Sequence, residues 1–243
     1  MSNLSTERSG QVLTITFSRP EKKNALTTEM YLAFSEALEN ASIDDSISVV
    51  MVTGSGDSFC AGNDLKDFLS GPGDITGQSP QARLINNLAT FPKPLIAAVD
   101  GITVGIGVTM LLHCDVVFSS PRSRFKTGFV DLGVVPEAGS TRLLAERVGA
   151  LNASSLFLLG DLISAEEAHR IGLLTAVVDD VVGHAHDRAQ QLSLKSLDAV
   201  VTTKALLRNH EGDLGDVIQR ENVEFSRLLK SEAFKEAASK LIR

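Results

Sequence analysis

Three short segments of the chain combine glycine turns with polar groups, and together they could support chemistry at a carbonyl. They span residues 54–65 (GSGDSFCAGNDL), 100–107 (DGITVGIG) and 133–141 (GVVPEAGST). Backbone N–H groups at a glycine turn or a helix N-terminus are well placed to hold an anionic oxygen, and the third segment adds one carboxylate, Glu137. Two N–H donors and one carboxylate suit proton transfer beside a carbonyl. The residues alone leave a second interpretation open, in which these are ordinary turns and Glu137 is solvated.

The signatures of several other chemistries are missing from the sequence. It contains no GxxxxGK[ST] phosphate loop, no HExxH zinc motif and no GxSxG nucleophile turn. The segment 105–107 (GIG) begins like a dinucleotide-binding fingerprint, but Met110 stands where the third glycine is required. His184, His186 and Asp187 occupy neighbouring helical positions that point apart. We therefore predict a solvated helix face there, and no metal site.

Strands and helices alternate over the first two-thirds of the chain, and they must position these segments. Strand patterns occur at residues 12–18, 47–53, 95–99 and 115–119. Helical patterns occur at residues 81–90 and 105–113, and another starts at Thr27 or Thr28. Residues 67–80 are rich in Gly, Ser, Pro and Asp, which indicates a mobile loop. The alternation predicts an α/β fold with βαβ crossovers and a mainly parallel sheet, in which ligands collect at the carboxyl ends of the strands.

The last third of the sequence is mainly helical. Ser164 and Glu167 form a capping box, Gly172 ends that helix, and residues 176–178 form at most a short strand. From residue 181 onward the pattern is helical. It includes the apolar stripe Leu214, Val217, Ile218, Phe225, Leu228 and Leu229. Such a stripe must be buried, either on the chain's own core or on a second subunit.

Composition excludes several classes of partner. The 243 residues carry a net charge of −7 and no basic run, so we expect neither nucleic acid nor a membrane surface as a partner. The two cysteines form no CxxC pair and are typical of reduced intracellular thiols. The apolar stretches are broken well before about 18 residues, too short to span a membrane. The polar N-terminus has no signal-peptide pattern, and no peroxisomal address ends the chain, so we expect a cytoplasmic protein.

An ordered set of motifs across nearly the whole chain resembles the crotonase superfamily, also called the enoyl-CoA hydratase/isomerase family. The set comprises FCAGNDL, KPLIAAVDG, VGIGV, HCDVVF, LGVVPEAGST and GDLISAEEAHRIGLLTAVV. The resemblance implies a ClpP/crotonase-like spiral of ββα units, with a core at residues 1–185 and a helical trimerisation region at residues 186–243. It also implies an acyl-CoA substrate and a homotrimer or a dimer of trimers. No cofactor or metal is implied beyond the coenzyme A thioester itself.

The resemblance also implies which residues form the site. The backbone N–H groups of Asn63 and Ile106 match the pair that holds the thioester oxygen as an enolate. Arg19, Lys22 and Lys23 could approach the CoA phosphates, or be solvated. By the same match, the expected CoA groove is lined by Lys23, Ala25, Ala61, Asn63, Asp64, Leu65, Val104, Gly105 and Ile106.

The chain departs from the hydratase pattern at the two positions that carry its glutamates. Their matching positions hold Thr109 and Phe129, and neither side chain exchanges a proton near neutral pH. Hydration needs one group to activate water and one to deliver a proton. Glu137 instead resembles the base of peroxisomal-type Δ3,Δ2-enoyl-CoA isomerases and their bacterial relatives, with its pKa raised by an apolar setting of Phe129, Val134 and Val135. The resemblance therefore favours an isomerase in fatty-acid or related acyl-CoA breakdown.

Alternatives stay open at this stage. The chain could be an enoyl-CoA hydratase with another acid, a thioester hydrolase, or a silent acyl-CoA-binding subunit. Asp131 could replace the missing acid, but its offset from the hydratase position favours the surface. We predict structural roles for His113 and Asp115, and we expect Asp64 to brace the first glycine turn rather than to react.

Overall fold

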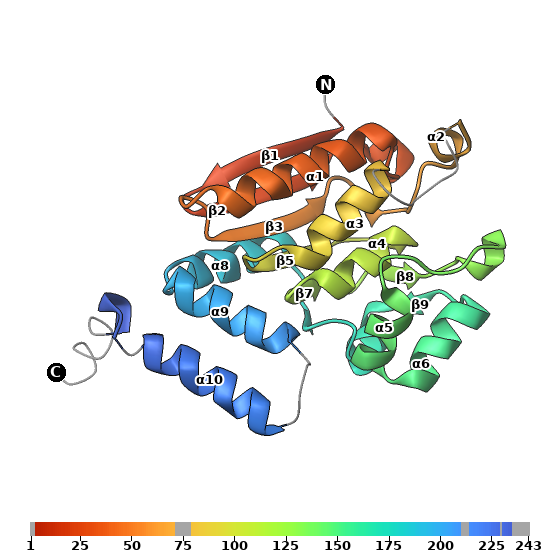
Figure 1. Ribbon diagram of the computed structural model, residues 1–243. Coiled ribbons are helices and arrows are strands. Elements are labelled where there is room, and N and C mark those ends of the chain that lie inside the picture. Colours follow the sequence, from red (N-terminus) through yellow and green to blue (C-terminus); the bar gives the residue numbers. More distant parts are fainter. Residues whose placement is uncertain (1–2, 71–78, 210–213, 229, 235–243) are drawn as a thin grey trace.

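A computed structural model describes residues 3–70, 79–209, 214–228 and 230–234. Its largest element is a six-stranded sheet in the order β1-β2-β3-β5-β7-β10 (Figure 1). The first two strands form an antiparallel hairpin, and the other neighbouring pairs run parallel. The strands are β1 (Leu4–Ser9), β2 (Val12–Phe17), β3 (Val49–Gly54), β5 (Leu95–Val99), β7 (Val116–Ser119) and β10 (Ala176–Val177).

The chain alternates between the large sheet and a second, four-stranded sheet. Its strands are β4 (Ser58–Cys60), β6 (Ile102–Val104), β8 (Arg124–Lys126) and β9 (Ile163–Ser164). After each of β3, β5 and β7 the chain crosses to this small sheet before it returns. This alternation is the predicted spiral of ββα units. The α/β class and the mainly parallel pairing are therefore confirmed.

Helices cover both faces of the large sheet. On one face, α1 (Thr28–Ile43) and α3 (Pro80–Thr90) pack against each other and join the main hydrophobic core with the small sheet. On the other face, α8 (Val181–Ser193) lies across β2, β3, β5 and β7. It forms a second core there with Val12, Val49, Met51, Ile96, Ala98 and Phe118. Because β3 and β5 are buried on both faces, their sequences are continuous apolar runs rather than alternating ones.

Shorter helices connect these layers and form the rim of the molecule. Thr27 caps α1, as expected, and Ser164 caps α7. A single 3₁₀ turn over Pro20–Lys22 precedes α1, and two more follow at Met110–His113 and Val130–Leu132. A π-helical turn spans Ser155–Leu159. The α-helices of this group are α2 (Leu65–Ser70), α4 (Ile106–Thr109), α5 (Ser140–Val148), α6 (Ala150–Ser154) and α7 (Ala165–Arg170).

Two sequence predictions need correction. The loop expected over residues 67–80 begins instead as the end of α2, whose first turn Asp64 caps by accepting from the Lys66 and Asp67 N–H groups. Residues 71–78 of that segment lie outside the described part of the chain. The helix expected over residues 105–113 is one α-turn, α4, that continues as the 3₁₀ turn from Met110 to His113.

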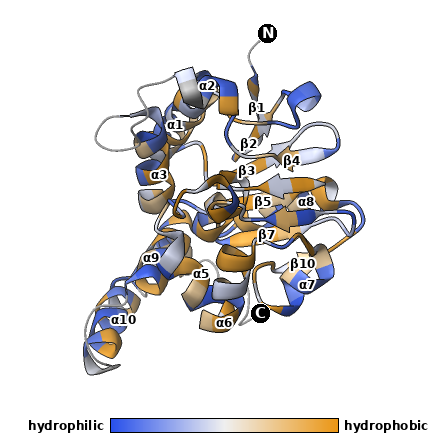
Figure 2. Ribbon diagram, turned by 90° about the vertical axis from the view of Figure 1, so that its right-hand side faces the viewer, coloured by the Kyte–Doolittle hydropathy of each residue, from blue (hydrophilic) through white to orange (hydrophobic). Residues whose placement is uncertain are grey.

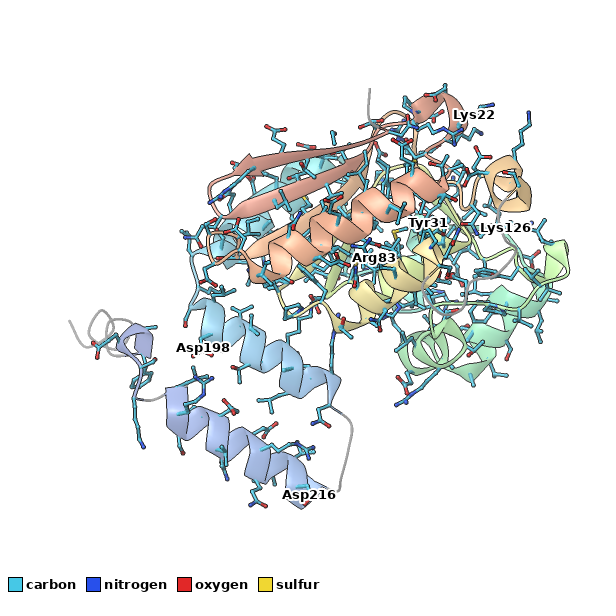
Figure 3. The ribbon with its side chains drawn as sticks, turned by 45° about the horizontal axis from the view of Figure 1, so that its top comes forward. Lys22, Tyr31, Arg83, Lys126, Asp198 and Asp216 are labelled. Atoms are coloured by element: carbon cyan, nitrogen blue, oxygen red, sulfur yellow. The ribbon has the colours of Figure 1, made fainter. Side chains whose placement is uncertain are left out.

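The last two described helices extend away from the sheets as an arm. It consists of α9 (Leu197–Arg208) and α10 (Leu214–Leu228), which lie side by side in Figures 1 and 2. Arg227 of α10 pairs at 2.6 Å with Asp198 of α9, which is labelled in Figure 3. The proposed boundary after residue 185 falls inside α8, which is part of the second core. The division at that point and the oligomerising role of the arm stay predictions. Leu229 of the predicted stripe lies outside the described residues.

Candidate functional site

Two glycine turns meet where β4 and β6 end. These strands pair in parallel, so their carboxyl ends lie at the same edge of the small sheet. A methyl group added at Gly62 would lie 3.3 Å from the Val104 carbonyl oxygen, and one added at Gly105 would lie 3.9 Å from the Gly62 Cα. Both glycines have positive φ angles, 96° and 55°, which side chains rarely adopt. Glycine therefore allows the two turns to approach closely.

Each turn presents a backbone N–H group without a protein partner. Ile106 is the first residue of α4, where an N–H has no intrahelical acceptor. Within residues 3–70 and 79–209, neither the Ile106 N–H nor the Asn63 N–H donates a hydrogen bond. Asn63 itself is fixed in place, because the flanking residues bond to the 19–26 segment: the Leu26 N–H donates to Gly62 O and the Asp64 N–H to Leu26 O. The pair is available to a negatively charged oxygen.

Tyr31 holds the side chain of Asn63. It lies on α1 (Figure 3), is almost fully buried, and donates its hydroxyl to Asn63 Oδ1 at 2.6 Å. Burial, and after it the nearby Glu137 carboxylate, raise the pKa of Tyr31 well above its usual value. The phenol therefore stays protonated and remains a donor. The sequence analysis missed this residue; its signal was a sole tyrosine on a buried helix face, where the hydroxyl needs a partner.

Glu137 is half-buried, and its hydrogen-bond partner is a hydroxyl group. Thr109, the last residue of α4, donates its hydroxyl to Glu137 Oε1 at 2.5 Å. Burial raises the pKa of Glu137 to about 7, and the hydrogen bond from Thr109 partly opposes that rise. A carboxyl group with a pKa near neutrality can both accept and return a proton.

The backbone beside Glu137 is strained, and a histidine side chain contacts it. Ala138 has a φ of 57°, a left-handed conformation that costs a residue other than glycine about 1–2 kcal/mol. Its carbonyl oxygen lies 2.9 Å from Nε2 of His113, which is buried at the end of the 3₁₀ turn. Because burial lowers the pKa of His113, the ring is neutral near pH 7 and donates from Nε2. This contact supports the structural role predicted for His113.

The structure brings the expected CoA-groove residues together along two paired segments. The Ala61 N–H donates to Lys23 O at 2.9 Å, and Leu26 pairs with Asn63 as an isolated bridge. Lys23 and Ala25 therefore lie alongside the first turn, and Val104 and Gly105 lie against Gly62. Leu65 begins α2 and is about half exposed. Whether this groove binds CoA stays a prediction.

Four charged side chains serve the structure rather than the site. Arg19 pairs with Asp64 at 2.7 Å and donates to Ala25 O, so it braces the first turn and is not free for phosphates. Asp64 accordingly has the bracing position that was predicted. Asp131 lies on the surface, as favoured, and pairs with Lys126 at 2.8 Å.

The predicted apolar setting of Glu137 is only partly correct. Phe129 is buried and packs against Phe157, with ring centroids 6.3 Å apart. Val134 and Val135 are 52% and 81% exposed, so in the single chain they do not account for the burial of Glu137. Both valines lie in the irregular segment that follows the 3₁₀ turn Val130–Leu132.

The described residues contain neither a metal-binding cluster nor a membrane-spanning helix. No group of three or more His, Cys, Asp or Glu side chains in the described part of the chain is arranged to hold a metal ion. None of the helices described is long and apolar enough to cross a membrane.

Comparison with known proteins places the whole chain in one group. The enoyl-CoA hydratase/isomerase family model matches residues 7–241. Enoyl-CoA delta isomerase 3, peroxisomal, of Mus musculus is 35% identical over 244 residues, which cover 93% of this chain and 77% of the relative. The 1,2-epoxyphenylacetyl-CoA isomerase of Escherichia coli K12 is 39% identical over 188 residues, which cover 75% and 71%.

A solved structure has the same architecture. It comes from Magnetospirillum magneticum AMB-1 and is provisionally assigned as an enoyl-CoA hydratase/carnithine racemase. The two structures superpose with a TM-score of 0.95 and 38% identity, over 99% of this chain and 96% of the other. Names of both reaction types, isomerase and hydratase, therefore occur among similar proteins.

Proposed function

This chain belongs to the enoyl-CoA hydratase/isomerase family, and we propose that it is a Δ3-to-Δ2 enoyl-CoA isomerase with Glu137 as its single base. The observation that carries the proposal is the environment of the Glu137 carboxyl group. Burial raises its pKa to about 7, and it accepts a hydrogen bond from α4, the helix whose first residue is Ile106. Isomerisation needs one group that takes a proton and gives it back. A pKa near the working pH suits both steps.

The residues at the two hydratase positions support isomerisation over hydration. Thr109 donates to Glu137, and Phe129 packs in an aromatic pair, so neither supplies an acid. Asp64 and Asp131, two other carboxylates considered from the sequence, are in ion pairs with Arg19 and Lys126. Among these site residues from the described part of the chain, Glu137 would have both to activate a water molecule and to deliver a proton.

The proposed reaction moves one proton and changes no other atom. Glu137 takes a proton from C2 of a 3-enoyl-CoA, and the electrons of that C–H bond delocalise through the neighbouring double bond onto the thioester oxygen. The N–H groups of Asn63 and Ile106 hold that oxygen. Glu137 then returns the proton to C4, which leaves the double bond between C2 and C3. A single donor of this kind is worth about 2.7–4 kcal/mol of barrier.

Glu137→Gln tests the proposal, because the amide keeps the shape and removes the proton chemistry. Isomerisation of 3-hexenoyl-CoA should fall at least about 100-fold, while acyl-CoA affinity measured by calorimetry changes little. The matched control is Asp131→Asn at the exposed ion pair with Lys126, which should keep near wild-type activity.

Three results would contradict the assignment. Isomerisation by Glu137→Gln at the wild-type rate would place the base elsewhere. Hydration of crotonyl-CoA by the wild-type protein at more than about 10 s⁻¹, the usual enzyme median, would favour a hydratase with another acid. Binding of acyl-CoA with neither activity would favour a silent binding subunit.

A further inference from the structure

The Thr109 hydroxyl has two acceptors within reach and is aimed at one of them. It lies 2.5 Å from Glu137 Oε1 and 3.5 Å from the carbonyl oxygen of Ile106, one turn back along α4. The longer contact is at the limit of a hydrogen bond, whereas the shorter one is typical of a hydroxyl donating to a carboxylate. Thr109 is almost fully buried, so water does not compete for its proton. An ionised carboxylate only accepts, which makes Thr109 the donor.

The two oxygens of Glu137 therefore have different surroundings. Oε1 accepts from Thr109, and Oε2 has no hydrogen-bond partner within residues 3–70 and 79–209. Thr109 stands three residues after Ile106 on the same short helix, so the donor to the carboxylate and the donor to the thioester oxygen are parts of one rigid element. Its β-branched side chain has few rotamers in a helix, which limits how far Oε1 can move.

We infer that Thr109 is a positioning residue for Glu137: its hydroxyl fixes Oε1 and orients Oε2 as the oxygen that takes and returns the proton. The role of Oε2 in proton transfer rests on the proposed isomerase function. The contact between Thr109 and Glu137 can be tested without that function. Thr109 stands where hydratases have a glutamate, which disfavours hydration. Its hydroxyl then orients the carboxylate of Glu137.

Thr109 should also influence the charge of Glu137. A hydrogen bond donated to the charged carboxylate stabilises it, which lowers the pKa that burial raises. In the described part of the chain, other titratable side chains near this site are Tyr31 from α1, Cys60 from β4 and His113, which contacts Ala138. Burial raises the pKa of Tyr31 well above its usual value and that of Cys60 to about 12, and it lowers the pKa of His113. Between pH 7 and 9, Glu137 is therefore the group of this set that titrates.

Two variants separate positioning from packing. Thr109→Val keeps the shape and removes the donor, whereas Thr109→Ser keeps the donor and removes a methyl group. With 3-hexenoyl-CoA, Thr109→Val should lose about 10- to 100-fold in kcat, the range for a hydrogen bond to a charged group. The acid limb of its pH–rate profile should move to higher pH. Thr109→Ser should stay within about threefold and keep the wild-type profile.

A direct titration gives a readout that does not depend on activity. Carbon-13 NMR of glutamate-labelled protein, with Glu137→Gln used to assign the signal, reports the pKa of the Glu137 carboxyl group in the whole chain. We expect a higher pKa in Thr109→Val than in the wild type, and the wild-type value in Thr109→Ser.

The outcomes distinguish this inference from the proposed function. An inactive wild-type protein that still shows the expected NMR shift would overturn the isomerase proposal and support the contact. Equal pKa values in all three proteins, or Thr109→Ser as impaired as Thr109→Val, would overturn the positioning role while an active wild-type protein keeps the isomerase proposal. A Thr109→Val protein with the wild-type rate and pH profile would also overturn it.

Discussion

The ionised form of Glu137, which the proposed reaction needs, lowers the stability of the folded protein. Glu137 sits where burial disfavours its charge, and its pKa is raised from an ordinary value of 4.5 to about 7. The folded state therefore binds the proton more tightly than the unfolded state. This contribution to stability is fully present below pH 4.5 and is lost as the pH rises through 7. The difference between the two pKa values corresponds to at most about 3 kcal/mol in the free energy of unfolding.

Glu137→Gln should therefore stabilise the protein at pH 8 and not at pH 5. The neutral amide is not penalised for charge burial, so its free energy of unfolding should exceed that of the wild type by up to about 3 kcal/mol at pH 8. Urea unfolding at both pH values and equal protein concentration measures the difference. The control is Glu21→Gln, at a side chain that is two-thirds exposed. An equal effect of Glu137→Gln at both pH values would show that the carboxyl group is not titrating as described.

Among the elements, α4 and β4 must touch for the two N–H donors to face one substrate oxygen. Gly107, the second residue of α4, makes that contact possible, because a methyl group there would lie 2.5 Å from the backbone oxygen of Cys60. That distance is shorter than real contacts, and neither backbone is the flexible end of a side chain. A larger residue would separate the helix from the strand, and with it the Ile106 donor from the Asn63 donor.

Gly107→Ala should therefore reduce isomerase activity about 100-fold or more, the effect of losing one such donor. The fold should be retained, since the displaced helix has a single turn, and circular dichroism checks this. Gly133→Ala is the control for a methyl group that meets no neighbour: no atom lies within 4 Å of it, and its cost is backbone strain, because Gly133, unlike Gly107, has a positive φ of 71°. Wild-type activity in Gly107→Ala would mean that the site tolerates a shift of α4.

The elements that the sequence predicted well are those whose environment is simple. Strands β3 and β5 are buried on both faces, so each forms a continuous apolar run that is easily recognised. By contrast, β4, β6 and β8 have three residues each, too few to show a period. Most of β1 is exposed and its sequence, LSTERS, is polar; hairpin pairing with β2 makes it a strand.

In the site too, single residues could be predicted from the sequence, whereas contacts between residues far apart in the chain could not. Glu137 could be found from the sequence because it is the one carboxylate of the third glycine-rich segment, where the family resemblance matches it to the isomerase base. Its contact with Thr109 joins residues 28 positions apart, and the contact between Tyr31 and Asn63 joins residues 32 apart. Neither follows from spacing along an element. The sequence shows at Thr109 the absence of a glutamate, and it does not show the contact of the Thr109 hydroxyl with Glu137.

At the scale of the whole molecule, the arm is connected to the site through Asp115. This carboxylate pairs with Lys204 at 2.6 Å and with Arg208 at 3.2 Å, both on α9. Arg208 also donates to the carbonyl oxygen of His113, whose ring contacts Ala138 beside Glu137. Residues that hold the arm therefore also hold the turn that carries the base.

The arm has exposed apolar side chains, which favours association of several chains. Among the described elements α10 packs mainly on α9, and Ile218 and Phe225, seven residues apart and so on one side of the helix, are 48% and 64% exposed. We expect sedimentation at micromolar concentration to give three or six times the chain mass of 25.9 kDa. Ile218→Asp should shift the protein toward smaller species, because a charge on an apolar interface must be desolvated. Gln219→Asp adds the same charge at an exposed polar position and should leave the mass unchanged. A wild-type mass equal to one chain would contradict the prediction, and the arm would then need another explanation for its exposed side chains.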